Sequence, residues 1–172
     1  MDVPSARSLF DRHHAVVYRF LRKLTGDASA AEDLSQEVFL RVVRGLETYE
    51  PRERELAWLF RIARRLVLDR HRSASRRPVL VEQVGEDVAG RSSQPHVRLD
   101  IDRALQDLGD PEREAFLLRE VGGLGYDEIA AVTGGTHDAV RNRIHRARMA
   151  LRAALAPVSI APRSAPLREA TP

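Results

Sequence analysis

Arginines gather in one short stretch of this sequence, where their spacing suits the binding of phosphate. Residues 136–152 contain five arginines and one acid, Asp138, whereas residues 99–135 contain nine acids and three arginines. Guanidinium groups bind phosphate oxygens through charge-assisted hydrogen bonds. The net charge of the chain is only +3. This local reversal of charge therefore indicates a nucleic-acid surface more clearly than the total charge does.

The basic stretch lies on the second helix of a predicted helix-turn-helix. A helix from Tyr126 to Thr133, the glycine pair 134–135 and a helix capped by Thr136 follow at the spacing of this motif. On the second helix, Asp138 and Asn142 lie opposite the apolar face. Cationic side chains flank them: Arg141, His145, Arg148 and Arg152. Short polar groups between cations suit base edges between phosphates, which indicates DNA binding. The alternative is a solvated basic helix.

A second basic row runs along a helix predicted from about Glu53 to His71. Its four arginines lie within about 40° of one another around the helix axis. They are Arg54, Arg61, Arg65 and Arg72. Trp58 lies at the edge of this row, and the predicted core face lies elsewhere, so cations and an aromatic ring together suit partly melted DNA. The alternative is that Trp58 packs under the neighbouring loop, residues 47–54.

Two further groups of polar residues are less specific. Asp33, Gln36 and Glu37 form one patch on a predicted helix, which alone is most often a solvated face. His13 and His14 are adjacent and point about 100° apart on a helix, which argues against a shared metal site. The sequence has no phosphate-binding glycine loop, zinc motif or activated nucleophile, so we expect no enzyme and no cofactor.

Helical periodicity positions all of these residues. No segment alternates at period two, so we predict an all-α fold. The expected helices cover residues 5–25, 29–46, 53–71, 99–108, a segment from 110, 126–133 and 136–155. We expect the second to begin at a capping box of Ser29 and Glu32, and the fifth at an Asp110 cap followed by Pro111.

The helices divide into two small helical domains joined by a flexible linker. Residues 73–98 are rich in Ser, Gly and Pro, as linkers are. We therefore expect one bundle at 1–72, the linker at 73–98, a helix-turn-helix domain at 99–156 and a disordered tail at 157–172. The sequence has no apolar run of the ~20 residues that span a membrane, no signal peptide pattern and no cysteine. We expect a cytoplasmic protein.

Three motifs resemble those of the extracytoplasmic-function sigma factors. Residues 31–42 (AEDLSQEVFLRV) resemble region 2.2 of that family, and residues 57–72 (AWLFRIARRLVLDRHR) resemble its regions 2.3 and 2.4. Residues 123–130 (GLGYDEIA) with residues 144–148 (IHRAR) resemble region 4.2. The resemblance covers residues 8–72 and 99–155 in the family's order. It implies a transcription initiation factor with a region 2 bundle and a region 4 helix-turn-helix.

The resemblance also implies partners and a role for each polar group. Asp33, Gln36 and Glu37 would dock on core RNA polymerase, whose beta and beta-prime subunits would be partners. The minus-ten promoter element would be captured by the loop 47–54 and by Arg54, Trp58, Arg61, Arg65 and Arg72. The minus-thirty-five element would be read by Thr136, His137, Asp138, Arg141, Asn142, His145, Arg146 and Arg148. Whether an anti-sigma factor also binds is left open, and no membrane insertion is implied.

The chain departs from the family pattern at a few positions. Arg65 replaces the usual Asn, and Ala139 and Asn142 replace the usual Thr and Ser, so the promoter sequence cannot be transferred from relatives. Gly135 replaces an apolar residue, and we expect a looser turn with a core side chain missing. Two rival hypotheses are a stand-alone helix-turn-helix regulator, which would leave the first domain unexplained, and a helical adaptor that binds only proteins.

Overall fold

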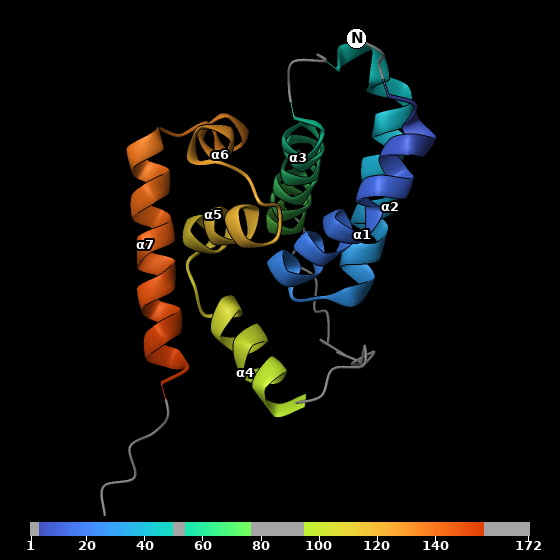
Figure 1. The fold of residues 1–172 in the computed structure, drawn as a ribbon. Helices are drawn as coiled ribbons and strands as arrows, with labels where there is room; N and C mark the ends of the chain where they lie inside the picture. The colour runs from blue at the N-terminus through green and yellow to red at the C-terminus, as the bar shows by residue number, and fades with distance from the viewer. Residues whose placement is uncertain (1–3, 50–53, 77–94, 157–172) are drawn as a thin grey trace, which may run out of the picture.

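The computed structural model describes residues 4–49, 54–76 and 95–156 (Figure 1). Within these ranges the chain is helical and has no strand, which confirms the all-α prediction. The α-helices are α1 Ala6–Thr25, α2 Ala28–Gly45, α3 Glu55–Arg76, α4 Pro95–Gln106, α5 Asp110–Glu120, α6 Tyr126–Thr133 and α7 His137–Ala154, and η1 Leu46–Thr48 is a 3-10 helix. No helix in these ranges is long and apolar enough to cross a membrane.

Local capping sets the bounds of the helix-turn-helix. Helix α6 ends at Gly134, which adopts the left-handed conformation with φ of 71°. Helix α7 begins after Thr136, whose hydroxyl oxygen accepts a hydrogen bond from the Ala139 amide at 3.2 Å. Both boundaries agree with the sequence prediction. Gly135 leaves no hole in the core, contrary to expectation: it is exposed, and an added Cβ would only contact Thr133 and Arg143.

Four boundaries differ from the prediction. Helix α2 is capped by Asp27, whose carboxylate accepts from the Ala30 amide at 3.1 Å, instead of by Ser29. Gly109 occupies the N-cap of α5, and the Asp110 carboxylate instead accepts from Arg113. Helices α3 and α4 extend into the expected linker from both sides. Its remainder, residues 77–94, lies outside the described residues, as do residues 50–53 of the expected minus-ten loop and the tail 157–172.

The buried side chains of both halves form one continuous core. Helices α1, α2 and α3 pack together in the first half, and α5 contacts both α6 and α7 in the second. The halves meet where α3 packs against α6 and where α1 packs against α4 and α5. Figure 1 shows α3 between the α1–α2 pair and the α5–α6 turn, with α7 on the far side of α5. The two expected domains are therefore in direct contact.

Candidate nucleic-acid interface

Helix α7 presents its polar strip to solvent, as its amphipathic pattern predicted. Asp138 and Asn142 are exposed. The opposite face is buried against the rest of the second half through Val140, Ile144, Ala147 and Leu151. Because the apolar face fixes the rotation of the helix, the polar strip and its flanking cations are held outward together.

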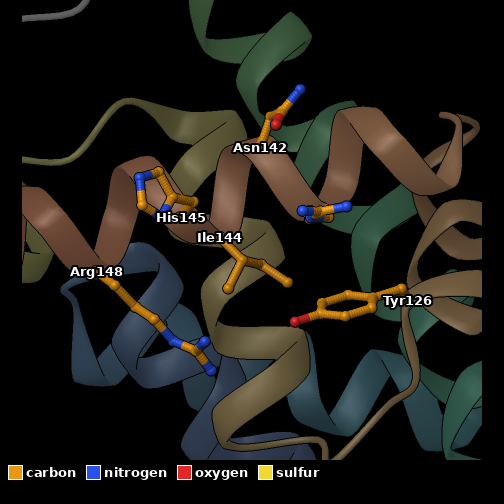
Figure 2. Close-up of a pocket in the computed structure, with 6 residues that line it drawn as sticks. Tyr126, Asn142, Ile144, His145 and Arg148 are labelled. Carbon is orange, nitrogen blue, oxygen red and sulfur yellow. The ribbon is translucent and has the colours of Figure 1, made fainter.

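A hollow of about 380 Å³ lies beside this polar strip. It is lined by Tyr126, Arg141, Asn142, Ile144, His145 and Arg148. Figure 2 shows Tyr126 and Arg148 on one side of α7, with Asn142 pointing away from them. The structure therefore brings together four residues that the sequence predicted for this surface, and it adds Tyr126, which the sequence analysis missed.

Tyr126 connects the two helices of the motif to α5. Its ring lies 5.3 Å from the His137 ring in an edge-to-face arrangement, and the Arg119 guanidinium lies 5.2 Å from its centroid. Its hydroxyl also interacts with Arg148. The sequence could have indicated this contact, because Tyr126 is the first residue of the predicted helix and directly follows the turn from α5.

Carboxylates of α5 hold two arginines of α7. Arg146 lies 2.9 Å from Glu112, and Arg148 lies 2.8 Å from Glu120. The hydrogen bond that Arg148 donates to the Glu120 carboxylate raises the pKa of Arg148. These pairs are partly exposed, so each contributes little to stability but orients a cation beside the polar strip.

The four arginines of the predicted basic row on α3 have different surroundings in the structure. Arg61, Arg65 and Arg72 are exposed on the helix. Arg54, just before the helix begins, reaches the second half, where it donates a hydrogen bond to the Gly123 carbonyl at 2.8 Å and another to Glu128 at 3.3 Å. Three members of the row are therefore exposed along α3, and the first member contacts the second half.

Trp58 does not stand at the surface, which corrects the expectation of an accessible ring. Its side chain is only 4% exposed and belongs to the core. It packs edge-to-face against Tyr49, with ring centroids 5.2 Å apart. The alternative reading, in which the ring packs under the segment that precedes α3, is the one this arrangement supports.

The start of α3 is tied to α1 by a cluster around Glu55. The Glu55 carboxylate lies 2.6 Å from Nε2 of His13 and 2.9 Å from the Arg12 guanidinium. Burial raises the pKa of Glu55, but the hydrogen bonds from His13 and Arg12 and the charge of Arg12 outweigh it, so the pKa is lowered. His13 is used here as a structural partner. No group of three or more metal-binding side chains occurs in the described residues.

The polar patch on α2 lies open to solvent at two of its three residues. Asp33 and Gln36 are exposed, and Glu37 pairs with Arg41 at 3.1 Å. Leu40 and Val43 are 50% and 65% exposed, and helical spacing places them on the same side as Asp33 and Gln36. The sequence analysis did not single out these two apolar residues. Together the five residues form a mixed surface of the kind that binds another protein.

Comparison with known proteins identifies both halves. Residues 9–77 match the family Sigma-70 region 2, and residues 98–151 match the family Sigma-70, region 4. The ECF RNA polymerase sigma factor SigE of Mycolicibacterium smegmatis is 37% identical, over 90% of this chain and 63% of its own length. The ECF RNA polymerase sigma factor SigL of Mycobacterium tuberculosis is 34% identical, over 87% of this chain and 88% of its own length. The chain thus spans less than two thirds of SigE.

Two solved structures share the fold. The sigma factor RpoE of Bartonella quintana, in complex with the anti-sigma factor NepR, superposes with a TM-score of 0.76 at 26% identity, covering 85% of this chain and 93% of that one. CnrH, in complex with the cytosolic domain of CnrY, gives a TM-score of 0.63 at 27% identity over 86% and 85% of the two chains.

Proposed function

Because the chain belongs to the ECF sigma factors of the sigma-70 family, we propose that it directs core RNA polymerase to specific promoters. The observation that carries this proposal is the outward polar strip of α7, flanked by arginines, on a chain whose other half presents the exposed patch of α2. A stand-alone DNA-binding regulator would need the first surface but not the second. We also propose that the chain acts in the cytoplasm without a cofactor, catalytic activity or membrane insertion.

The first half docks on polymerase through α2 in this proposal. Asp33 and Gln36 offer exposed polar groups to the beta-prime or beta subunit, and Glu37 is held beside them by Arg41. Exposed charges at the rim of an interface steer association, whereas apolar residues at its centre supply affinity. Leu40 and Val43 provide that apolar part.

The two DNA surfaces would read the two promoter elements. On α7, Asp138 and Asn142 would face base edges, while Arg141, His145, Arg146 and Arg148 would contact phosphates and Thr136 and His137 would lie at the helix start. On α3, Arg61, Arg65 and Arg72 would follow the backbone of the minus-ten element, with Arg54 at the start of the row. Trp58 would support this surface from the core, since its ring is buried.

An anti-sigma factor is the further partner that we propose. The structural relatives RpoE and CnrH are described in complexes, RpoE with the anti-sigma factor NepR and CnrH with the cytosolic domain of CnrY. Both superpose over most of this chain, and this shared fold supports the proposal.

Reconstitution with purified core polymerase tests the proposal. The chain should produce promoter-specific transcripts from a library of duplex templates, and Asp33→Arg combined with Glu37→Arg should abolish polymerase association while helicity stays unchanged. Asp11→Arg combined with Asp107→Arg changes the total charge equally at exposed positions away from the patch and should keep activity. A chain that binds palindromic duplex but yields no transcripts with polymerase would be a stand-alone regulator instead.

A further inference from the structure

A second hollow lies away from the polar strip of α7. Its volume is about 530 Å³, and side chains of α1, α2, α3, α5, α6 and α7 contribute to its lining. The hollow beside the polar strip is smaller and is lined from α6 and α7. Small organic molecules are usually bound in hollows of roughly 300–1,000 Å³ between several structural elements. The size and the place of the second hollow are therefore those of a small-molecule site.

Part of this lining is apolar. Leu34 and Val67 are buried there, and Leu68 and Pro111 are more open to solvent. Burying the carbon atoms of a ligand against such side chains is favourable in proportion to the apolar area removed from water. The hollow can therefore hold the hydrocarbon part of an organic molecule.

The charged part of the lining has more cations than anions. Four arginines, from α3, α5 and α7, face three carboxylates across the hollow, and one histidine also lines it. The histidine adds positive charge only when it is protonated. The lining as a whole therefore favours a ligand that carries negative charge.

The three carboxylates already have partners. Asp27 caps α2 and accepts a hydrogen bond from a backbone amide. Asp110 accepts a hydrogen bond from Arg113 at 2.8 Å, and the Glu114 carboxylate lies 2.9 Å from Arg64. An opposite charge beside each of the last two offsets their own charge, so they offer little attraction to a cationic ligand.

Two arginines of the lining are left over. Within residues 4–49, 54–76 and 95–156, Arg70 and Arg143 form no ion pair. Arg70 is exposed, whereas Arg143 is only partly exposed. Burial raises the pKa of Glu114, and the charges of Arg64 and Arg143 oppose this rise without cancelling it. Arg143 therefore lies on the charged side of the hollow without a carboxylate of its own.

Arg113 adds a hydrogen-bond donor that is not used. Its Nε–H group is buried and has no acceptor within the part of the chain that the structure describes. Buried donors almost always have an acceptor, in the protein or in a bound molecule. This donor therefore indicates a place for an oxygen atom in the hollow.

We propose that this hollow binds a small amphiphilic organic anion, whose charged head contacts Arg143 and whose hydrocarbon part lies against Val67 and Leu68. Such binding goes beyond the proposed function, since neither DNA nor polymerase takes part in it. The chain would then respond to a metabolite-sized ligand, because a molecule that binds only the folded chain stabilises it by mass action.

Two fluorescent probes that differ in charge test the charged head. Anilinonaphthalene sulfonate is an amphiphilic anion, and phenylnaphthylamine has the same rings without the sulfonate. We expect the full chain to bind the sulfonate probe at one site, and Arg143→Gln to weaken this binding about tenfold, the effect of losing one hydrogen bond between charged groups. The affinity for the neutral probe should stay unchanged.

Matched variants control for total charge and for folding. Arg19→Gln makes the same charge change at an exposed site of α1 outside the hollow and should leave both affinities unchanged. Arg143→Lys keeps the positive charge and should retain most of the affinity for the sulfonate probe. Equal weakening by Arg19→Gln and Arg143→Gln, with unchanged circular dichroism, would overturn the assignment of the head to Arg143.

Leu68→Gln tests the hydrocarbon part at a residue that is 36% exposed and can be replaced without loss of the fold. It should weaken the binding of both probes about threefold, because both would bury their rings there. Leu40→Gln removes an exposed leucine from the patch of α2 and should leave both affinities unchanged. If Leu40→Gln has the larger effect, the probes bind the surface of α2, and a ligand site in the hollow is refuted.

Displacement of the sulfonate probe identifies the class of ligand. Decanoate should displace it from the wild-type chain, whereas inorganic phosphate at the same concentration should not, because phosphate has no hydrocarbon part. Displacement by phosphate but not by decanoate would refute an amphiphilic ligand. A chain that transcribes with polymerase but binds neither probe refutes the ligand site and leaves the proposed function standing. A chain that binds the sulfonate probe as expected but yields no transcripts refutes the proposed function alone.

Discussion

Helices α3 and α7 both carry rows of arginine, but the fold places them differently. Helix α7 lies at one side of the molecule with its polar strip open, and its partners Glu112 and Glu120 come from within its own half. Helix α3 lies where the first half meets the second, its Trp58 is in the core, and Arg54 just before it is held by the second half. The region 4 surface is therefore exposed on one half, whereas the region 2 row has its first member held by the opposite half.

Of the variants compared here, we expect the largest loss of stability on removing the buried Trp58 side chain. Trp58→Ala should lower the free energy of unfolding by about 3–5 kcal/mol, the usual cost of truncating a buried aromatic residue. Arg65→Ala, on the exposed side of the same helix, should change it by no more than about 0.5 kcal/mol. Urea unfolding followed by circular dichroism measures both. Equal stability of the two variants would mean that the Trp58 ring is not part of the core.

A structural feature of this chain was predictable from the sequence when the residues that determine it are close together in the sequence. The bounds of α6 and α7 were predictable because Gly134 and Thr136 act within a few residues of themselves. The predicted start of α2 was wrong because Asp27 and Ser29 are both residue types that cap helices well. Only the folded chain shows which of them accepts a hydrogen bond from a free amide of the first turn. The sequence offered the packing of Trp58 under residues 47–54 only as an alternative, and nothing in it pairs Phe60 with Gly122, since these contacts depend on how helices and halves dock.

The Glu55 cluster should give a pH-dependent effect specific to the first half. A carboxylate whose pKa is lowered by folding adds stability above its unfolded pKa of about 4.3, and this contribution is lost as pH falls through the lower, folded value. Glu55→Gln should therefore cost about 1–2 kcal/mol at pH 7, and the difference from wild type should shrink as pH falls below the unfolded pKa and through the lower, folded one.

Unfolding curves of wild type and Glu55→Gln at several pH values measure that difference. Because the other carboxylates titrate in both proteins, subtracting one from the other isolates Glu55. A gap that stays constant from pH 7 to pH 3 would mean that Arg12 and His13 do not stabilise the charged form, and the link from α1 to the start of α3 would have to be packing alone.

The cap of α7 should have a smaller effect that is confined to the second half. Thr136→Ala removes the acceptor for the Ala139 amide and should cost about 1 kcal/mol. Thr136→Ser keeps the hydroxyl and should retain most of the stability. Hydrogen exchange of the first amides of α7 should rise in the alanine variant only, and an increase in α3 instead would show that the halves unfold as one unit.

The smallest effect on stability, and the sharpest test of the exposed α7 surface, concerns the Arg148–Glu120 pair. Glu120→Gln removes an exposed partner and should change the unfolding free energy by no more than about 0.5 kcal/mol. It should nevertheless tighten binding to duplex DNA of any sequence, because Arg148 no longer has to leave a carboxylate before it binds a phosphate.

Arg148→Ala should weaken binding to all sequences alike and reduce the slope of log affinity against log salt by about one. Asn142→Ala, by contrast, should alter base preference at one position and leave the salt slope unchanged, since its amide faces base edges and carries no charge. Binding titrations of a randomised minus-thirty-five element at several salt concentrations separate these outcomes. Indistinguishable salt slopes for Arg148→Ala and Asn142→Ala would mean that α7 meets DNA in a different rotation, and the polar strip would then lie against phosphates instead of bases.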